Sequence, residues 1–273
     1  MREPQVRLAD LGWDESWRVA LASPAATGAR RSCPGEEPGL VSRVDRGLCI
    51  VLTGSGVVRA SLGGDLLDAL ARDPANGPCT GDWCRIRHWP DGPVTIEALA
   101  PRRTVVVRAD ASRSSRGQAL AANVDVVGLV VALHPEPNLM RIERLLTIAW
   151  GSGALPAVIL TKSDLAMDGD AIAEDVRAAA PGVAVFVCSA TTGDGVDAVR
   201  SLVGPGRTLA LVGASGHGKS TLANALVGAE LLTTMEIRAD GKGRCPHPKS
   251  SKQAATRQSG GYWHGFSFLP WLG

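Results

Sequence analysis

The spacing of hydrophobic residues changes character near the middle of the chain. From Leu40 to Leu99, short apolar runs alternate with turn residues, which is typical of a small barrel of short strands. From Asn123 onward, near-continuous apolar runs alternate with helical segments, which indicates a parallel sheet covered by helices. The pattern therefore predicts an all-β barrel followed by an α/β domain.

The barrel region is predicted to contain five strands and a short helix. The expected strands are 40–45, 48–53, 56–62, 82–89 and 95–99, with a helix at 66–71. A further helix is expected near 14–22, where Trp13 and Trp17 lie four residues apart and are interpreted as packing residues. We interpret Trp83 and Trp89 as core residues or as plugs at the ends of the barrel.

The second region is predicted to alternate strands with helices. We expect strands at 126–133, 157–160, 183–187 and 209–212, and helices at 139–149, 171–179, 196–202 and 221–231. Such sheets bind ligands beyond the carboxyl ends of their strands. The segment His134-Pro135-Glu136-Pro137 also follows a strand, but we interpret it as a loop because two potential ligands do not make a metal site.

One loop of this region has the sequence of a phosphate-binding loop. Residues 213–220 match G-x-x-x-x-G-K-[ST] and lie between an apolar strand and a helix, as the motif requires. The glycines let backbone N–H groups face phosphate oxygens, and the helix N-terminus adds partial positive charge. We expect Lys219 to contact the β- and γ-phosphates and Ser220 to bind magnesium. The expected phosphate-site residues are Gly213, Ala214, Ser215, Gly216, His217, Gly218, Lys219, Ser220 and Thr221.

Two further segments suggest which base is bound. Thr161-Lys162-Ser163-Asp164 resembles the N-K-x-D motif of GTPases, in which the aspartate accepts hydrogen bonds from guanine N1–H and N2–H2. Adenine lacks that donor pair, so its binding would leave the carboxylate unpaired. Cys188-Ser189-Ala190 resembles the S-A-[KT] motif, whose backbone supports guanine O6. The expected guanine-site residues are Thr161, Lys162, Asp164, Ser189 and Ala190.

The base-reading segments precede the phosphate loop, which is the order of circularly permuted GTPases. The chain resembles the ribosome small subunit-dependent GTPase A family, the RsgA or YjeQ type, from about Gly39 to Arg244. Supporting segments are Pro78–Trp83, Pro101–Arg103, Ala121–Asp125 and Gly195–Asp197. The resemblance implies an N-terminal extension at 1–38, an RNA-binding OB-fold barrel at 39–110, a permuted GTPase domain at 118–244 and a non-family tail at 245–273.

The resemblance also implies a function. It predicts a GTPase that assists late maturation of the small ribosomal subunit, with GTP or GDP and magnesium as cofactors. The expected partners are the subunit and its rRNA, and the protein is expected to be a cytoplasmic monomer. No catalytic residue is predicted. The arginines that could form an RNA-binding patch on the barrel are Arg43, Arg46, Arg59, Arg85, Arg87, Arg102 and Arg103.

Composition limits these possibilities only broadly. The net charge of +2 excludes a chain that is basic throughout, so RNA binding would need a local patch. The six cysteines are scattered without a C-x-x-C motif, and we interpret them as buried small residues in a reducing cytosol. No apolar run is long enough to span a membrane and no signal-peptide pattern is present, so we expect a soluble protein without membrane contact.

The resemblance ends after the phosphate-loop helix. The family has a threonine-rich switch and then a strand ending in D-T-P-G, whereas Gly241–Arg244 here leads into Cys245-Pro246-His247-Pro248. The family's zinc ligands are absent, because Cys245 and His247 are too close together and have no partners. The tail has neither helical nor strand periodicity, so we expect it to be disordered and its removal to leave nucleotide affinity nearly unchanged. A shifted reading frame or a truncation near Arg244 would explain the change, and divergence is the alternative.

Three functions remain open at this point. The first is the GTPase described above. The second is a hydrolysis-deficient nucleotide- or RNA-binding remnant, because the switch threonine and the D-x-P-G aspartate would complete the magnesium site. The third is an ATP-dependent, kinase-like P-loop enzyme, which Asp164 and Ser189-Ala190 disfavour.

Overall fold

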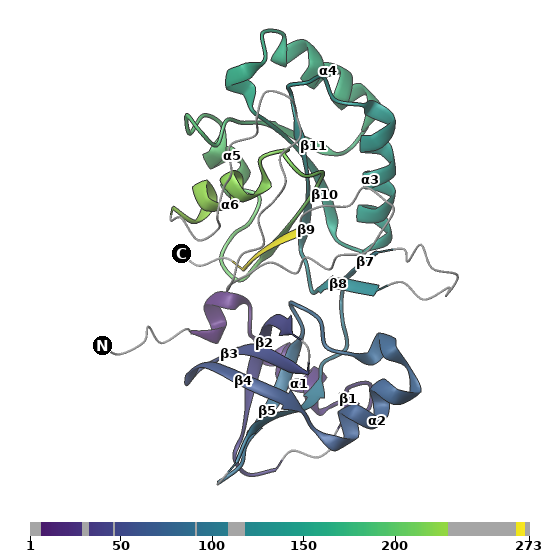
Figure 1. Cartoon of the computed structure of the whole chain (residues 1–273), viewed down its shortest axis with the longest axis vertical. Helices are drawn as coiled ribbons and strands as arrows, with labels where there is room; N and C mark the ends of the chain where they lie inside the picture. Colours follow the sequence, from purple (N-terminus) through teal and green to yellow (C-terminus); the bar gives the residue numbers. More distant parts are fainter. Residues whose placement is uncertain are drawn as a thin grey trace. The chain divides into compact units, whose positions relative to one another are not determined.

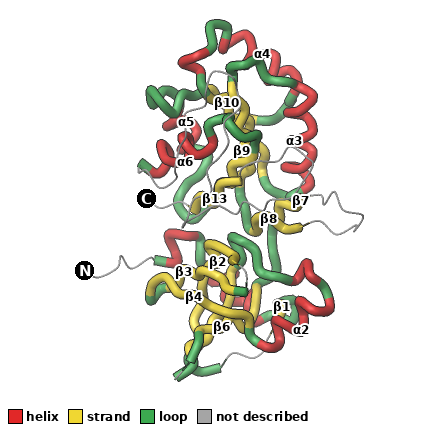
Figure 2. Tube along the Cα trace, viewed as in Figure 1, coloured by secondary structure: helices red, strands yellow, loops and turns green. Residues whose placement is uncertain are grey.

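The chain forms two compact units, residues 1–124 and 125–273. The structure, a computed structural model, describes residues 7–28, 33–45, 47–90, 92–108, 118–228 and 266–270. Within these ranges, every helix is too short or too polar to cross a bilayer. Figure 1 shows the chain coloured along its sequence, and Figure 2 separates the strand-rich first unit from the helix-covered sheet of the second.

The first unit is built on a closed five-stranded barrel. Its strands are β2 (Glu36–Asp45), β3 (Leu48–Thr53), β4 (Gly56–Leu62), β5 (Trp83–His88) and β6 (Val94–Leu99). In spatial order the strands of the barrel are β2, β3, β4, β6 and β5, and β5 pairs again with β2, which closes the barrel. Among these pairs, only β4 and β6 are parallel. Helix α2 (Gly64–Arg72) follows β4. This arrangement is that of an OB fold, which confirms the predicted barrel.

Alternating side chains fill the interior of the barrel. Val41, Val51, Ile86 and Ile96 point inward from four strands and are fully buried, and Leu66 of α2 packs against them. Breaks in register lie between Val41 and Arg43 and between Arg85 and Ile86. Such bulges bend strands, and this bending allows a short sheet to close on itself.

The N-terminal segment packs on the barrel through tryptophans. It comprises η1 (Leu8–Leu11), α1 (Glu15–Ala22) and β1 (Thr27–Gly28), which pairs with β6. The Asp14 carboxylate caps α1 by accepting a hydrogen bond from the backbone N–H of Trp17 at 3.1 Å. The ring centroids of Trp13 and Trp17 lie 5.1 and 6.2 Å from that of Trp83, so all three are packing residues, as predicted.

The second unit is a parallel sheet with helices on both faces. Its parallel strands are β11 (Ala184–Val187), β10 (Leu155–Thr161), β9 (Val126–Ala132) and β12 (Thr208–Val212), in that spatial order. Figure 1 shows α3 (Leu139–Gly151) and α4 (Gly169–Ala179) on one side of the sheet. On the other side lie α5 (Val196–Arg200) and α6 (Lys219–Val227). The carboxyl ends of β9, β10 and β12 therefore meet at one edge.

Two features of the fold differ from the sequence-based prediction. Phe266–Pro270 forms a strand, β13, that pairs antiparallel with β12 from Thr208 to Val212, so this part of the tail is not disordered as expected. The hairpin of β7 (Val105–Arg108) and β8 (Gln118–Ala122) was also not predicted. Its second strand belongs to the first compact unit, which ends at Val124.

Candidate nucleotide-binding site

The loop between β12 and α6 passes very close to the neighbouring strand. A β-carbon at Gly213 would lie 2.2 Å from the Val130 carbonyl oxygen, so no other residue fits there without moving β9. Gly218 has φ of +81°, a conformation that residues with a β-carbon rarely adopt, and it forms the N-cap of α6. Both glycines therefore have structural roles that agree with the phosphate-loop motif.

The start of α6 has the features of an anion site. Gly218 has no side chain with which to cap the helix, and Lys219 and Ser220 form its first turn. Lys219 is buried, and its Nζ donates a hydrogen bond to the Ala214 carbonyl at 2.5 Å, so the ammonium group lies against the loop. The backbone N–H groups at the start of a helix, the helix dipole and a buried cation at one place favour a phosphate ligand.

His217 connects this loop to the end of β9. Its Nδ1 accepts a hydrogen bond from the backbone N–H of Ala132 at 3.3 Å. Burial, and after it the positive charge of Lys219, lower the pKa of the imidazole to about 4. His217 is therefore neutral near pH 7 and adds no charge to the loop.

The T-K-x-D segment lies directly against the phosphate loop. Thr161 is the last residue of β10 and is almost fully buried, and its Oγ1 donates a hydrogen bond to the His217 carbonyl at 2.8 Å. Lys162 adopts the left-handed conformation, with φ of 60° and ψ of 40°. The chain then enters the short helix η3 (Ser163–Leu165), which contains Asp164. The Thr161 hydroxyl thus joins the two loops by a hydrogen bond.

The S-A segment lies beside the same turn. The backbone N–H of Ser163 donates to the Cys188 carbonyl at 3.3 Å, which connects η3 to the end of β11. Ser189 is fully buried, and its Oγ accepts a hydrogen bond from the Thr192 N–H at 3.2 Å. Three loops that are far apart in sequence are therefore adjacent at one edge of the sheet.

Parts of the predicted chemistry cannot be placed. Cys245, His247 and the segment 229–265 lie outside the described residues. Among the residues that are described, no group of three or more His, Cys, Asp or Glu side chains could hold a metal ion. Cys49, Cys79, Cys84 and Cys188 are buried free thiols whose pKa is raised by burial, in agreement with their interpretation as small core residues.

The candidate arginines on the barrel fall into two groups. Arg85 is buried and forms an ion pair with Glu36 at 2.8 Å. Both ends of the Arg102 guanidinium contact the buried Asp82 carboxylate at 2.8 Å, and hydrogen bonding to that carboxylate raises the pKa of Arg102. These two side chains hold the unit together, so we leave them out of the RNA surface proposed below.

The other candidates lie on the surface of the barrel where they are described. Arg43 on β2 is opposite Ile50 on β3, which in turn is opposite Arg59 on β4. Because directly paired residues share a face, the two arginines belong to one row across three strands. Arg87 is half-buried at the end of β5, Arg103 stacks on Trp17 at 3.7 Å, and Arg46 lies outside the described residues.

Comparison with known proteins places this architecture in a family. A model of the RsgA GTPase family matches residues 99–262, which extends beyond Arg244, where the motif resemblance ended. The small ribosomal subunit biogenesis GTPase RsgA of Streptomyces coelicolor is 45% identical over 259 residues, covering 93% of this chain and 66% of the relative. The protein of the same name from Streptomyces avermitilis is 40% identical with the same coverage. The chain thus spans about two thirds of the length of these relatives.

Solved structures agree on the fold. YjeQ from Thermotoga maritima has a TM-score of 0.57 and 24% identity, and the match covers 73% of this chain and 68% of that one. YloQ, described as a circularly permuted GTPase, has a TM-score of 0.53 and 19% identity, with coverage of 72% and 67%.

Fold, loop order and comparisons lead to one classification. An OB-like barrel followed by a sheet whose predicted base-reading segments precede the predicted phosphate loop is the architecture of circularly permuted P-loop GTPases. Within that class, the chain belongs to the RsgA GTPase family.

Proposed function

We propose that this chain binds guanine nucleotides, hydrolyses GTP and assists maturation of the small ribosomal subunit. The observation that carries the proposal is the hydrogen bond between Thr161 Oγ1 and the His217 carbonyl, at 2.8 Å. It holds the predicted base-reading loop against the predicted phosphate loop, so one nucleotide can contact both. The relatives from Streptomyces coelicolor and Streptomyces avermitilis are named for small-subunit biogenesis, and these names supply the biological context.

Each loop has a defined role in this proposal. The Asp164 carboxylate accepts hydrogen bonds from guanine, the Lys162 side chain lies along the base, and the backbone at Ser189 and Ala190 supports O6. Backbone donors of residues 213–218 and the N-terminus of α6 bind the phosphates, and Lys219 offsets their charge. Thr221, in the first turn of α6, extends this contact.

Magnesium fits this site as a cofactor that binds together with the nucleotide. Mg²⁺ usually takes few protein ligands and completes its shell with phosphate oxygens and water. Ser220, next to Lys219 at the start of α6, would supply a hydroxyl ligand. When bound, the ion would neutralise charge that develops on the phosphates during transfer. The chain's own residues bind and orient the nucleotide; no described residue is assigned to activate water.

The barrel is proposed to contact rRNA. Its support is the row that contains Arg43 and Arg59 on the outer face of β2, β3 and β4. Strands two and three of OB folds are a common nucleic-acid surface, and here these strands are β3 and β4. With the subunit as partner, we propose that the protein acts as a cytoplasmic monomer.

A titration of the purified chain tests the nucleotide site. Fluorescent GDP should bind and be displaced by GTP but not by ATP, because adenine does not offer Asp164 the paired donors. Lys219→Ala should abolish tight binding. ATP that displaces GDP as well as GTP does would refute the guanine assignment, and GDP binding within a few-fold in the lysine variant would refute the phosphate assignment.

A hydrolysis-deficient nucleotide-binding protein is the second candidate. It is favoured by the sequence after α6, in which neither a threonine-rich switch nor D-x-P-G occurs. Single-turnover GTP hydrolysis with and without small ribosomal subunits separates the two candidates. Acceleration by subunits supports the GTPase, whereas GDP binding without hydrolysis in either condition supports the second candidate.

A further inference from the structure

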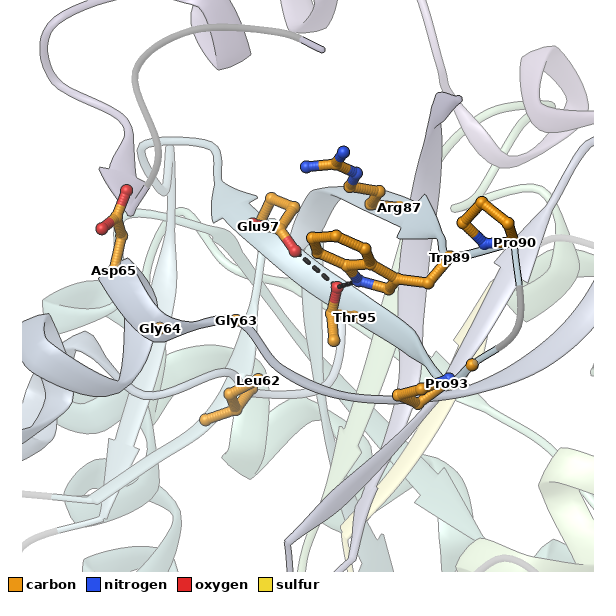
Figure 3. A pocket seen from close by; sticks show the side chains of 11 residues that line it. Leu62, Gly63, Gly64, Asp65, Arg87, Trp89, Pro90, Pro93, Thr95 and Glu97 are labelled. Carbon is orange, nitrogen blue, oxygen red and sulfur yellow. Dashed lines mark hydrogen bonds between the residues drawn. The ribbon is translucent and has the colours of Figure 1, made fainter. Parts of the chain in front are cut away.

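A pocket on the barrel remains unexplained by the nucleotide site. Its volume is about 760 Å³, within the usual range for small-ligand sites. It is formed by the end of β4, the start of α2, the facing parts of β5 and β6, and the loop that joins β5 to β6. Figure 3 shows Trp89 and Arg87 on one side of it and Leu62 and Gly63 on the other.

Trp89 is held in an exposed position within this pocket. Its side chain is 42% exposed, so it is not the barrel plug predicted from the sequence. The indole Nε1–H donates to Thr95 Oγ1 at 2.9 Å, and the Thr95 hydroxyl donates in turn to Glu97. The Arg87 guanidinium carbon lies 3.9 Å from the ring centroid. These contacts fix the orientation of a large aromatic surface that little of the core covers.

The polar groups around the indole suit a nucleobase with an exocyclic amine. The Glu97 carboxylate lines the pocket. A β-carbon at Gly63 would lie 2.9 Å from Glu97 Oε2, so a side chain at position 63 would push this carboxylate aside. Carboxylate oxygens accept hydrogen bonds from the amino groups of adenine, guanine and cytosine, which uracil lacks. Arg87 provides N–H donors for a phosphate on the same strand of RNA.

The strand register connects the pocket to the arginine row. On β4, Ser61 is two residues beyond Arg59 and therefore on the same face, about 7 Å away. Ser61 is opposite Thr95, which is opposite Arg87. The row of Ser61, Thr95 and Arg87 thus lies next to the row of Arg43, Ile50 and Arg59, on the same face of the barrel. Asp65 and Glu97 would also suit a cationic peptide, and Arg43 is paired with Asp45 at 2.7 Å, but the exposed Arg59 and the nearby Arg87 favour a polyanion.

We propose that this pocket binds one unpaired RNA base, stacked on Trp89, with a preference for bases that carry an exocyclic amine. The inference rests on the proposed role of the barrel in rRNA binding and adds a defined subsite to it. The loop between the fourth and fifth strands of OB folds commonly contacts oligonucleotides, and Trp89 begins that loop here. Stacking on aromatic side chains is the usual way in which such barrels bind single strands.

The test uses the full chain saturated with GDP and two labelled RNA hexamers, UUUAUU and UUUUUU. Trp89→Ala should weaken binding of UUUAUU about 5- to 150-fold, which corresponds to the roughly 1–3 kcal/mol lost with one stacked base. Trp89→Phe should keep most of the affinity, because it keeps a stacking face. Trp150→Ala is the matched control, since Trp150 is 53% exposed on α3 in the other unit, and it should bind RNA like the unchanged chain.

Two further variants identify the contacts. Glu97→Gln should reduce the preference for UUUAUU over UUUUUU, because an amide offers uracil a donor that a carboxylate does not. Arg87→Gln should reduce the slope of log K against log salt by about 0.7, whereas Trp89→Ala should leave that slope unchanged. Equal effects of Trp89→Ala and Trp150→Ala would overturn the proposal.

Separate readouts distinguish this inference from the proposed function. GDP titration of every variant reports the nucleotide site, which lies in the other unit and should be unaffected. If the unchanged chain binds GDP but neither hexamer, the RNA role of the barrel fails and the subsite with it. If a labelled hexa-arginine peptide, and not RNA, binds in a manner that depends on Trp89, the pocket is a protein-docking site and the proposal is wrong.

Discussion

Under the proposed function, single residues at the edge of the sheet determine which nucleotide the site accepts. Asp164 is placed by a sharp turn: Lys162 in the left-handed conformation ends β10 and directs the chain into η3. Thr161 anchors that turn to the phosphate loop. In the proposed site, base specificity would therefore depend on the Asp164 carboxylate, on a turn whose first residue is anchored to the phosphate loop.

Asp164→Asn should shift base preference from guanine toward xanthine. The amide can donate to the xanthine carbonyl but cannot accept both guanine donors, and the loss should weaken GTP binding by roughly 2–4 kcal/mol. Competition between GDP and xanthosine diphosphate measures the change. Asp168→Asn, on the same loop before α4, is the control and should leave both affinities unaltered. Unchanged GTP affinity in Asp164→Asn would show that another group reads the base.

The neutral His217 should make stability depend on pH. Its pKa is about 4 in the fold and near 6.5 in the unfolded chain, so the unfolded chain binds more protons between these values. The free energy of unfolding should therefore fall as the pH drops from 6.5 to 4, by at most about 3 kcal/mol from this group. Urea denaturation of His217→Gln should show a smaller fall over that window. Parallel curves for both proteins would contradict the assignment.

Arg102→Ala should destabilise the first unit strongly. It removes both charged contacts to the buried Asp82 and leaves that carboxylate with the Cys79 N–H, at 2.7 Å, as its described partner. Loss of one member of a buried ion pair costs about 3–5 kcal/mol. Chemical denaturation measures the loss, and Arg103→Ala provides the comparison. That exposed arginine stacks on Trp17 and donates a hydrogen bond to the exposed Ser16 hydroxyl, so its loss should cost about 1 kcal/mol or less.

At the level of secondary structure, the sequence predicted the regular elements well. The expected strands 48–53 and 56–62 coincide with β3 and β4, because both have alternating side chains and a clear turn between them. The glycines of the predicted phosphate loop were predictable from the motif: a β-carbon at Gly213 would clash with the Val130 carbonyl, and Gly218 has a positive φ that favours glycine. The bond from Thr161 to His217 was not predictable, because it joins residues 56 positions apart.

One of the missed elements depends on a distant partner for its formation. Strand β13 has no periodic pattern of its own, and its strand conformation follows from pairing with β12. Trp89 was predicted to continue a strand, yet the turn residues Pro90, Gly92 and Pro93 that follow it mark a loop. If these turn residues had been taken to end the strand before Trp89, the sequence would have predicted an exposed tryptophan.

Removal of residues 266–273 should destabilise the second unit. The deletion exposes the edge of β12, the strand that leads into the phosphate loop, whereas the sequence had suggested that the tail could be removed without effect on nucleotide binding. Each kcal/mol lost should lower the melting temperature by about 2–4 °C, and GDP affinity should fall with it. Removal of 271–273 alone keeps β13 and is the control. Identical melting curves for the two deletions would show that β13 adds no stability.

At the scale of the whole molecule, the two compact units are proposed to have different binding roles. The proposed nucleotide site lies within the second unit and the proposed RNA surface within the first. Arg43→Glu combined with Arg59→Glu should weaken association with small subunits and reduce its salt dependence by about 0.7–0.9 per lost phosphate contact. GDP affinity should stay unchanged.

A surface charge reversal elsewhere controls for net charge. Arg177→Glu changes an exposed arginine on α4 that pairs only with its neighbour Glu174. It should leave the salt dependence of subunit binding as it is. If Arg177→Glu and the double variant behave alike, the subunit senses overall charge and not the row on the barrel.

The order of strands in the second sheet also has a consequence for synthesis on the ribosome. Strand β9 is buried along its whole length between β10 and β12, yet about 75 residues separate it from β12 in the chain. At usual elongation rates of about 5–20 residues per second, β9 waits roughly 4–15 s for that neighbour. Late in this interval the nascent chain contains the predicted base-reading segments but still has an apolar strand with one open edge. A chaperone, or a pause in translation, would act most usefully before Thr208 emerges.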